Sequence, residues 1–415
     1  MGSQFRLSNY LPVLLLFVGV GLFLTKCISD DKRESAGETV QQLEKPDFSA
    51  FAGSKTCGGC HKDIYSTHLQ TAHFNTSANA SQDNVLGSFE KGKNRYNYTP
   101  ALYIMMEKTD SGLYQEVYFH GEKKRAFRFD ITTGSGAKGQ TYLYWEGNKL
   151  FQLPISFFSA ASQWSVSPGF PPDKVLFDKP ITSRCLECHA TFATVTSLPE
   201  AKQEEYNKAQ LILGVDCEKC HGPGAAHVKA HEENKEDTSG KHIIDPASFS
   251  RQQKLDMCVL CHGGSMKKTE PSFSFMPGKP LTDFFIPDTT SLHADNVDVH
   301  GNQFGLLKKS PCFLRSETMT CTTCHDPHKK ERENLVLYSS RCMNCHNEQH
   351  GNFCRVKPMP ANIRVNCIDC HMPKRPSRAV TLFEEGKDVP TAAMIRTHFI
   401  SVYPSEKMGL RSVVD

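Results

Sequence analysis

Seven copies of the pentapeptide Cys-x-x-Cys-His constrain this chain of 415 residues more than any other feature. They are Cys57–His61, Cys185–His189, Cys217–His221, Cys258–His262, Cys321–His325, Cys342–His346 and Cys367–His371. Their second cysteines are Cys60, Cys188, Cys220, Cys261, Cys324, Cys345 and Cys370. This pentapeptide is the attachment signature of c-type haem: both thiols add to the porphyrin vinyl groups, and the histidine binds the iron as its proximal ligand. The sequence therefore predicts seven covalently bound haem c groups, each with one iron.

Two other uses of paired cysteines explain the pattern less well. Two CxxC pairs can hold one Zn²⁺ between four thiolates, but an odd number of pairs leaves one over. Zinc also gives no reason for a histidine after every second cysteine. Disulfides within the motifs are disfavoured because cysteines so close in sequence rarely bridge without strain.

The N-terminus predicts export from a bacterial cytoplasm. Arg6 is the only charge before a mostly apolar run from Leu11 to Leu24, which is short for a membrane span and suits a signal-peptide core. Cys27 follows in a string that resembles a bacterial lipoprotein signal, although Lys26 stands where a small residue is usual. We expect lipidation at Cys27, with an uncleaved anchor as the alternative. Both interpretations place the haem-carrying part in the periplasm or attached to the outer membrane.

The spacing of the motifs divides the chain into segments. We expect a signal peptide at 1–26, a flexible tether at 27–50, the first haem module at 51–90, a β-rich insertion at 91–180, haems two to four at 181–270, a connection at 271–310, haems five to seven at 311–375 and a C-terminal tail at 376–415. The predicted fold class is a multihaem cytochrome c: mostly irregular, with short α-helices around packed haems and a small antiparallel β segment. Without haem we expect no stable fold.

The β segment is predicted from alternating residues between about Asn94 and Phe158. Two apolar strands flank the turn signal Thr109–Gly112, which is typical of a hairpin. We interpret this sheet as a wall that keeps water from the haems, with a docking surface for a redox partner as the alternative. Ahead of Cys217, the helix-forming residues 204–213 predict a short helix.

Histidines outside the motifs supply candidates for the second axial ligand of each iron. There are eleven: His68, His73, His120, His227, His231, His242, His293, His300, His328, His350 and His398. Seven irons with two histidines each need seven of them. Such pairs close the iron to substrates and suit electron transfer, whereas one missing ligand makes a reactive iron.

Several strings resemble the cytochrome c-554-like multihaem cytochromes. They are Cys217–His227 (CEKCHGPGAAH), Cys321–His328 (CTTCHDPH), the opening module Cys57–His73 and the closing Cys367–Pro373. The resemblance covers most of the chain from Gly53 to Pro376 except the β segment. It implies that His73, His227 and His328 are distal ligands of haems other than their sequence neighbours. We add His300, His350 and His398 as candidates, with the seventh from His68, His231 or His293; a surface or hydrogen-bonded role is the alternative for each.

Two cysteines remain once the motifs and Cys27 are subtracted. Cys312 and Cys354 form a disulfide in an oxidising compartment, or stay as free buried thiols.

The charge of the chain argues against a nucleic-acid partner. The formal net charge is +3, and loss of residues 1–26 together with seven ferric haems brings it to roughly −6, because each haem carries two ionised propionates. The predicted function is electron transfer in a respiratory or extracellular chain, with other cytochromes or a quinol-linked membrane complex as partners. The alternative is an oxidoreductase for a small nitrogen or sulfur compound at one open haem, where Arg125, Arg128 and Lys138 hold an anion. No catalytic residue is assigned.

Overall fold

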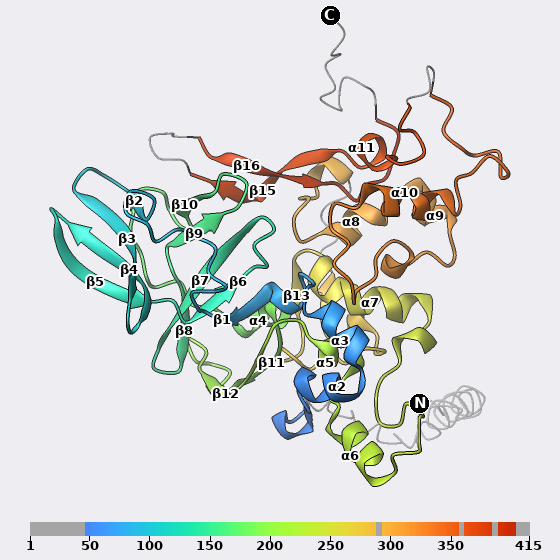
Figure 1. Ribbon diagram of the computed structural model, residues 1–415, viewed down its shortest axis with the longest axis horizontal. Helices are drawn as coiled ribbons and strands as arrows, with labels where there is room; N and C mark the ends of the chain where they lie inside the picture. Colours follow the sequence, from blue (N-terminus) through green and yellow to red (C-terminus); the bar gives the residue numbers. More distant parts are fainter. Residues whose placement is uncertain (1–45, 288–292, 357–360, 384–388, 404–415) are drawn as a thin grey trace, which may run out of the picture. The chain divides into compact units, whose positions relative to one another are not determined.

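The computed structural model describes residues 46–287, 293–356, 361–383 and 389–403. The predicted signal peptide, most of the tether and the lipidation site Cys27 lie outside these residues. Residues 45–415 form a single structural unit, whose elements are labelled in Figure 1. Within the described part of the chain, no helix is both long and apolar enough to cross a membrane.

The described helices are short, as predicted, and the longest has 12 residues. The α-helices are α2 Ser54–Cys60, α3 Lys62–His68, α4 Ser183–His189, α5 Cys217–His221, α6 Ala225–Glu233, α7 Arg251–His262, α8 Gln303–Leu307, α9 Pro311–Arg315, α10 Leu335–Met343 and α11 Ile368–His371. The 3₁₀ turns are η2 Phe48–Ala50, η3 Phe74–Thr76, η4 Pro246–Ser248, η5 Leu281–Asp283, η6 Ala294–Asn296 and η7 Cys321–Thr323. The longest, α7, begins with a capping box: Ser250 Oγ accepts the Gln253 N–H, and the Gln253 side chain accepts the Ser250 N–H.

The predicted β segment is antiparallel but forms two sheets rather than one. The four-stranded sheet contains β2 Arg95–Asn97, β3 Leu102–Thr109, β4 Gly112–Phe119 and β5 Glu122–Arg128. The six-stranded sheet contains β1 Ser77–Asn79, β6 Ile131–Thr133, β7 Gly139–Glu146, β8 Lys149–Gln152, β9 Ile155–Phe158 and β10 Gln163–Val166. The hairpin prediction is confirmed, because β3 and β4 pair across Asp110 and Ser111. The strands also continue beyond Phe158 to Val166.

The helix predicted over residues 204–213 is wrong. Residues Tyr206–Leu213 form strand β12, which pairs with β11 (Ala190–Val195) immediately after the second motif. Tyr206 is fully buried in this pairing, and its hydroxyl donates to the Ile181 carbonyl at 2.8 Å. Pairing and side-chain burial therefore override the helical preference of the segment.

Two further hairpins were not predicted. They pair β13 Met266–Lys268 with β14 Phe285–Pro287, and β15 Lys374–Leu382 with β16 Thr391–Arg396. Figure 1 shows β15 leading directly out of α11, which carries the seventh motif. The predicted boundary between residues 375 and 376 falls inside β15, and the segment boundaries stay predictions.

Buried apolar side chains are concentrated in the two sheets. Phe129, Tyr142 and Trp164 pack edge-on or tilted against one another at the centre of the largest cluster. In the C-terminal third, by contrast, the described cluster of buried residues consists of Val297, Val299 and Leu306. Side chains alone therefore provide little core around motifs five to seven, as expected for a chain whose core is completed by large apolar ligands.

The six-stranded sheet packs against the helix that carries the second motif. Leu143 and Leu150 share a buried cluster with Leu186, which lies between Cys185 and Cys188. Ser165 of β10 also donates to the Phe383 carbonyl at 2.8 Å, which ties the sheet to the end of β15. These contacts agree with the interpretation of the sheet as a wall beside the motifs.

Candidate functional site

Each motif begins on, within or next to a short helical turn. The first four lie in or at the ends of α2, α4, α5 and α7; the fifth begins in η7, the sixth at the end of α10 and the seventh at the N-cap of α11. In motifs one, five, six and seven the histidine N–H donates to the carbonyl of the first cysteine, at 2.9 to 3.1 Å. A helical turn places residues three and four apart on one face. The two thiols and the imidazole of a motif are thereby held on the same side.

Six of the seven motif histidines have a partner for the ring nitrogen Nδ1. The partners are Thr76 Oγ1 for His189, the Ile244 carbonyl for His221, Gln303 Oε1 for His262, Tyr338 Oη for His325, the Asn352 carbonyl for His346 and the Ser401 carbonyl for His371. A carbonyl can only accept, so Nδ1 donates to it and Nε2 keeps its lone pair. This is the arrangement by which proteins orient metal-binding histidines.

Four motif histidines face a second histidine from a distant part of the chain. The ring centres are 6.5 Å apart for His61 and His227, 6.1 Å for His221 and His328, 6.1 Å for His262 and His73, and 6.2 Å for His325 and His398. Three of these pairs are close to parallel, and the His73–His262 pair is steeply inclined. The partners are not in hydrogen-bonding contact.

The common spacing matches one metal ion between two imidazoles. A metal–nitrogen bond of about 2 Å, and roughly 1.1 Å from each nitrogen to its ring centre, put the two centres about 6.2 Å apart. Burial and repulsion from His262 lower the pKa of His73 to about 4, and burial and repulsion from His325 lower that of His398 to about 4. These rings are therefore neutral near pH 7, as a metal ligand must be.

The remaining predicted distal ligands occupy different settings. Burial lowers the pKa of His189, a hydrogen bond with Thr76 opposes this, and repulsion from His300 adds to the lowering. His350 folds back on its own motif, with Nδ1 3.3 Å from the Cys345 carbonyl. The ring centre of His231 lies 4.5 Å from that of His227, and His231 Nε2 is 3.1 Å from the Ser239 carbonyl. His293 is exposed.

His68 is the most unusual of the histidines outside the motifs. It is 7% exposed, and neither ring nitrogen makes a hydrogen bond. Its Nε2 lies 3.9 Å from the Asp216 carboxylate, and its ring centre lies 6.3 Å from that of His328. A buried imidazole without hydrogen bonds is costly. This histidine fits a site that a bound group completes.

Thiols of different motifs lie near one another. Cys57 of motif one is close enough to Cys217 of motif three to lower the pKa of the first thiol and raise that of the second. The second and fourth motifs meet in the same way through Cys188 and Cys261. Cys258 and Cys321 join the fourth and fifth motifs. All fourteen motif thiols are unbridged.

Neither of the two leftover cysteines is bridged either. The structure records Cys312 and Cys354 as free thiols, both partly buried. Burial raises the pKa of Cys312. A bond between the two stays a prediction, which a thiol count on denatured, unreduced protein tests.

The anion-holding residues predicted from the β segment do not converge. Arg125 and Arg128 lie on the exposed strand β5, where charged side chains protect a sheet edge. Lys138 lies elsewhere, and its ammonium donates to the Met394 carbonyl of β16 at 3.2 Å. Among the described residues, no cluster of three or more His, Cys, Asp or Glu side chains is arranged around a bare metal ion.

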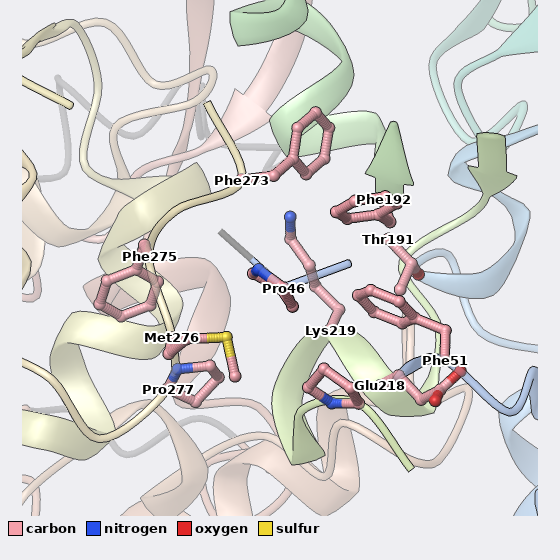
Figure 2. A pocket seen from close by; sticks show the side chains of 11 residues that line it. Pro46, Phe51, Thr191, Phe192, Glu218, Lys219, Phe273, Phe275, Met276 and Pro277 are labelled. Carbon is pink, nitrogen blue, oxygen red and sulfur yellow. The ribbon is translucent and has the colours of Figure 1, made fainter. Parts of the chain in front are cut away.

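Sequence reasoning missed the charged residues inside the motifs. Glu218, in motif three, is 4% exposed and accepts backbone N–H groups from Ala52, Gly53 and Gly224 at 2.7 to 2.9 Å. Figure 2 shows its neighbour Lys219 pointing into an aromatic-lined pocket. A signal was available in the sequence, since a carboxylate between the two cysteines of an attachment motif is close to a large apolar group and needs hydrogen-bond partners there.

Three comparisons with known proteins bear on this site. The family model for cytochrome c554 and c-prime matches residues 173–222, which include motifs two and three. The multiheme cytochrome MtrA of Shewanella baltica (strain OS185) is 25% identical over 200 residues, which is 46% of this chain and 53% of that protein. The chain thus spans about half the length of this relative. These matches support a likeness to the multihaem c-type cytochromes.

A solved structure resembles this chain in fold. The crystal structure of the outer cell wall cytochrome OcwA matches with a TM-score of 0.52 and 17% identity, over 87% of this chain and 81% of that one. At this identity the likeness concerns the fold alone. The likeness to multihaem c-type cytochromes implies covalently bound haem c, and the thiols and facing imidazoles described above fit that group.

Proposed function

We propose that this chain binds seven haems and passes electrons through them between redox partner proteins. The observation that carries the proposal is the closeness of thiols from different motifs, because each thiol marks the edge of an attachment site. When bound, each haem supplies an iron that takes up or releases one electron. The chain's part is to hold the sites in contact and to orient their histidines.

The contacts arrange the sites in an order different from that of the sequence. Motif one meets motif three, and motif four meets motifs two and five through its two cysteines. The helix α10 of motif six then connects to both neighbours: Arg341 donates to the Cys324 carbonyl at 2.6 Å, and Ser339 Oγ accepts the Cys367 N–H at 2.9 Å. Every motif thus lies beside another.

Histidine pairs support closed irons at five sites. We assign His227 to the first site, His300 to the second, His328 to the third, His73 to the fourth and His398 to the fifth. The proposal rests on the 6.1 to 6.5 Å ring spacing for four of these pairs. For the second site it rests on the lowering of the His189 pKa, which burial dominates and to which His300 contributes. His350 stays a candidate for the sixth or seventh site, and His68, His231 and His293 stay candidates for the last ligand.

The cellular setting belongs to the same proposal. We infer export to the periplasm or the outer membrane, attachment through Cys27 or an N-terminal anchor, and partners that are cytochromes or a quinol-linked complex. These inferences rest on the N-terminal sequence and on the need to attach haem c outside the cytoplasm. Labelling with a radioactive fatty acid tests lipidation, with Cys27→Ala as the variant that loses the label.

An EPR spectrum of the oxidised, haem-loaded protein tests the electron-transfer function. We expect seven haems per chain by pyridine haemochrome assay and low-spin iron at every site. A stoichiometric high-spin signal that shifts on adding nitrite, hydroxylamine or sulfite contradicts a pure electron carrier.

One observation favours the oxidoreductase as a second candidate. Lys374 and Arg396 lie directly opposite each other in the β15–β16 register, and Lys138 reaches the same hairpin. Arg396 also bonds Asp369, inside the seventh motif. Like charges placed directly opposite each other are unfavourable. The Asp369 carboxylate offsets them in part, and its pKa is lowered by the Asn366 hydrogen bond and by Arg396 and Lys374. One carboxylate stands against two cations, so a small oxyanion beside the seventh site fits the remaining positive charge, and the same EPR titration detects it.

A further inference from the structure

The hairpin of β15 and β16 presents one face to solvent beside the seventh motif. In its antiparallel register Lys374 lies opposite Arg396. Two residues along the hairpin, Pro376 lies opposite Met394. Side chains two apart in a strand point to the same side of a sheet, so these four share one face. Ile395 points to the other side and packs on the buried cluster of the C-terminal third.

This face has apolar side chains bounded by cations. Met394 is 48% exposed, and Pro376 is exposed as well. Lys138, from the loop before β7, donates to the Met394 carbonyl at 3.2 Å. The exposed methionine therefore lies between Lys138 and the opposed pair of Lys374 and Arg396. We call these five residues the hairpin face.

Positive charge exceeds negative charge on the hairpin face. The Asp369 carboxylate binds one of the two opposed cations. Burial lowers the pKa of Lys138, and repulsion from Arg332 and Lys374 lowers it further. Attraction from Glu333 opposes this effect. The face is thus cationic, although the haem-loaded chain as a whole is expected to carry roughly −6.

The hairpin face adjoins the seventh attachment site. Strand β15 begins at Lys374, directly after motif seven, and Figure 1 shows it leaving α11. Arg396 donates to the Met372 carbonyl at 3.2 Å and binds Asp369, which lies between the two cysteines of the motif. Motif seven is also the last in the order of neighbouring motifs described above. A partner on this face would therefore meet one end of that order.

We propose that the hairpin face is the docking surface for an acidic redox protein that exchanges electrons with the seventh haem site. This inference rests on the proposed electron-transfer function. Carboxylates around the partner's redox centre would meet the cations and steer the encounter, and the apolar side chains would exclude water from the contact. One electron leaves the reduced partner and reduces the iron of the site by one unit, and no bond forms or breaks.

A protein surface explains the hairpin face better than a small oxyanion does. An oxyanion would use the cations alone and would gain nothing from the exposed Met394 and Pro376. A protein surface covers the cations and the apolar side chains together, as interfaces with a charged rim do. The cations also come from two strands and a separate loop, which suits a broad contact.

Two double variants with the same change in net charge test the proposal. Lys138→Glu with Lys374→Glu reverses two cations of the hairpin face. Lys91→Glu with Lys108→Glu is the matched control, because both lysines are exposed in the β segment. Met394→Ser tests the apolar part. Each protein is loaded with haem and counted by haemochrome assay.

The probes are two small redox proteins of opposite charge. Reduced flavodoxin, which is acidic, gives electrons to the oxidised chain, and a basic cytochrome c takes electrons from the reduced chain. Stopped-flow absorbance gives second-order rate constants at about 0.01 M and about 1 M ionic strength, where charges are screened beyond about 30 Å and about 3 Å.

We expect the hairpin double variant to slow electron transfer from flavodoxin by roughly tenfold at low salt, with the difference lost at high salt. The control should change this rate by less than about twofold, and neither double variant should slow the basic cytochrome. Met394→Ser should slow flavodoxin at both salt concentrations, because salt does not screen apolar contact. If charge reversal lowers the haem content, Lys138→Gln with Lys374→Gln gives the same comparison.

Several results overturn the proposal. Equal slowing in both double variants shows an effect of net charge alone, and greater slowing in the control places docking on the β segment. Unaltered flavodoxin rates combined with a nitrite-induced EPR shift assign the hairpin face to a small anion. A dimer of the unaltered chain that the hairpin double variant abolishes assigns it to a second copy. Failure of the electron-transfer function itself is distinguished by incomplete reduction of the unaltered protein with dithionite.

Discussion

The Glu218 carboxylate accepts the Gly53 N–H at 2.9 Å, which joins motif three to the start of the first haem module across 165 positions of sequence. The same carboxylate accepts the N–H groups of Ala52 and Gly224. Gly53 has φ of +80° just before α2, a conformation that glycine adopts without strain. One buried side chain thus sets how the first attachment helix meets the third.

Replacing this carboxylate should weaken the junction of motifs one and three. Glu218→Ala leaves one buried and two part-buried N–H groups without partners, and a buried group left so costs about 1–3 kcal/mol. We expect a fall of about 2–3 kcal/mol in the free energy of unfolding, with altered EPR signals at the first and third sites. Denaturant titration and EPR measure the two effects.

The matched control for Glu218 is Glu204, whose carboxylate binds Ser183 at the start of α4, the helix that carries the second motif. This carboxylate accepts from the Ser183 hydroxyl at 2.9 Å and lies 2.8 Å from the Tyr206 hydroxyl. Glu204→Ala should disturb the second site and spare the first. Equal changes at the first site in both variants would show a general loss of stability rather than a specific junction.

Two neighbouring histidines offer a sharp test of axial ligation. His227 faces His61 at 6.5 Å, whereas His231 lies beside His227 and bonds the Ser239 carbonyl. We expect His227→Ala to convert one low-spin iron into a high-spin iron, because the first site loses its second ligand. His231→Ala should leave all EPR signals unchanged. The reverse result would assign the first site to His231.

Loss of the fourth motif should damage more than one site. Cys188 and Cys321, from the second and fifth motifs, lie near the two cysteines of α7. The double variant Cys258→Ser, Cys261→Ser removes one attachment site and the packing around it. We expect a loss of two or more haems per chain by mass spectrometry, together with lower soluble yield, since haem completes the core here.

The comparison for this experiment is Cys342→Ser, Cys345→Ser in the sixth motif. The turn that follows α10 is largely exposed, and Cys345 is itself exposed. We expect this variant to lose one haem and to keep the signals of sites one to four. A loss confined to one haem in both variants would contradict the central position of α7.

The attachment motifs and the β hairpin were predictable from sequence because each depends on residues close together in the chain. The turn at Asp110 and Ser111 follows from local pattern alone. Strand β12 was not predictable from its own residues. It is a strand because it pairs with β11, which follows the second motif directly. The division of the β segment into two sheets likewise depends on which strands pair with each other, and the local sequence of each strand does not specify this.

The histidine pairing shows the same limit at the candidate site. The resemblance implied that His227 and His328 serve haems other than their neighbours, and the structure places them opposite His61 and His221. Spacing in sequence contains no information on that choice. The charged residues within the motifs were missed for a related reason: Glu218 and Lys219 occupy positions that attachment leaves free, and their partners come from parts of the chain distant in sequence.

Acid should weaken the connection between motifs five and six. Arg341 of α10 binds Glu331 through both guanidinium nitrogens, at 2.5 and 2.6 Å, and Glu331 also accepts the Asp326 N–H at 3.0 Å. The hydrogen bonds from Arg341 hold the pKa of Glu331 below its usual 4.5. A carboxylate with a lowered pKa in the folded state binds fewer protons than in the unfolded chain. Its stabilising contribution is therefore complete above pH 4.5 and is lost as the pH falls through the lowered value.

We expect the unfolding temperature of the haem-loaded protein to fall as the pH drops below about 4.5. In Glu331→Gln we expect a smaller fall over the same pH range, because this carboxyl no longer takes up a proton. The control is Glu90→Gln: Lys93 also lowers the pKa of Glu90, but this pair is fully exposed and solvent screens it. Calorimetry across this pH range compares the two variants with the unaltered chain. If the unfolding temperature of Glu331→Gln falls with pH as steeply as that of the unaltered chain, the Glu331–Arg341 pair is not the source of the acid sensitivity.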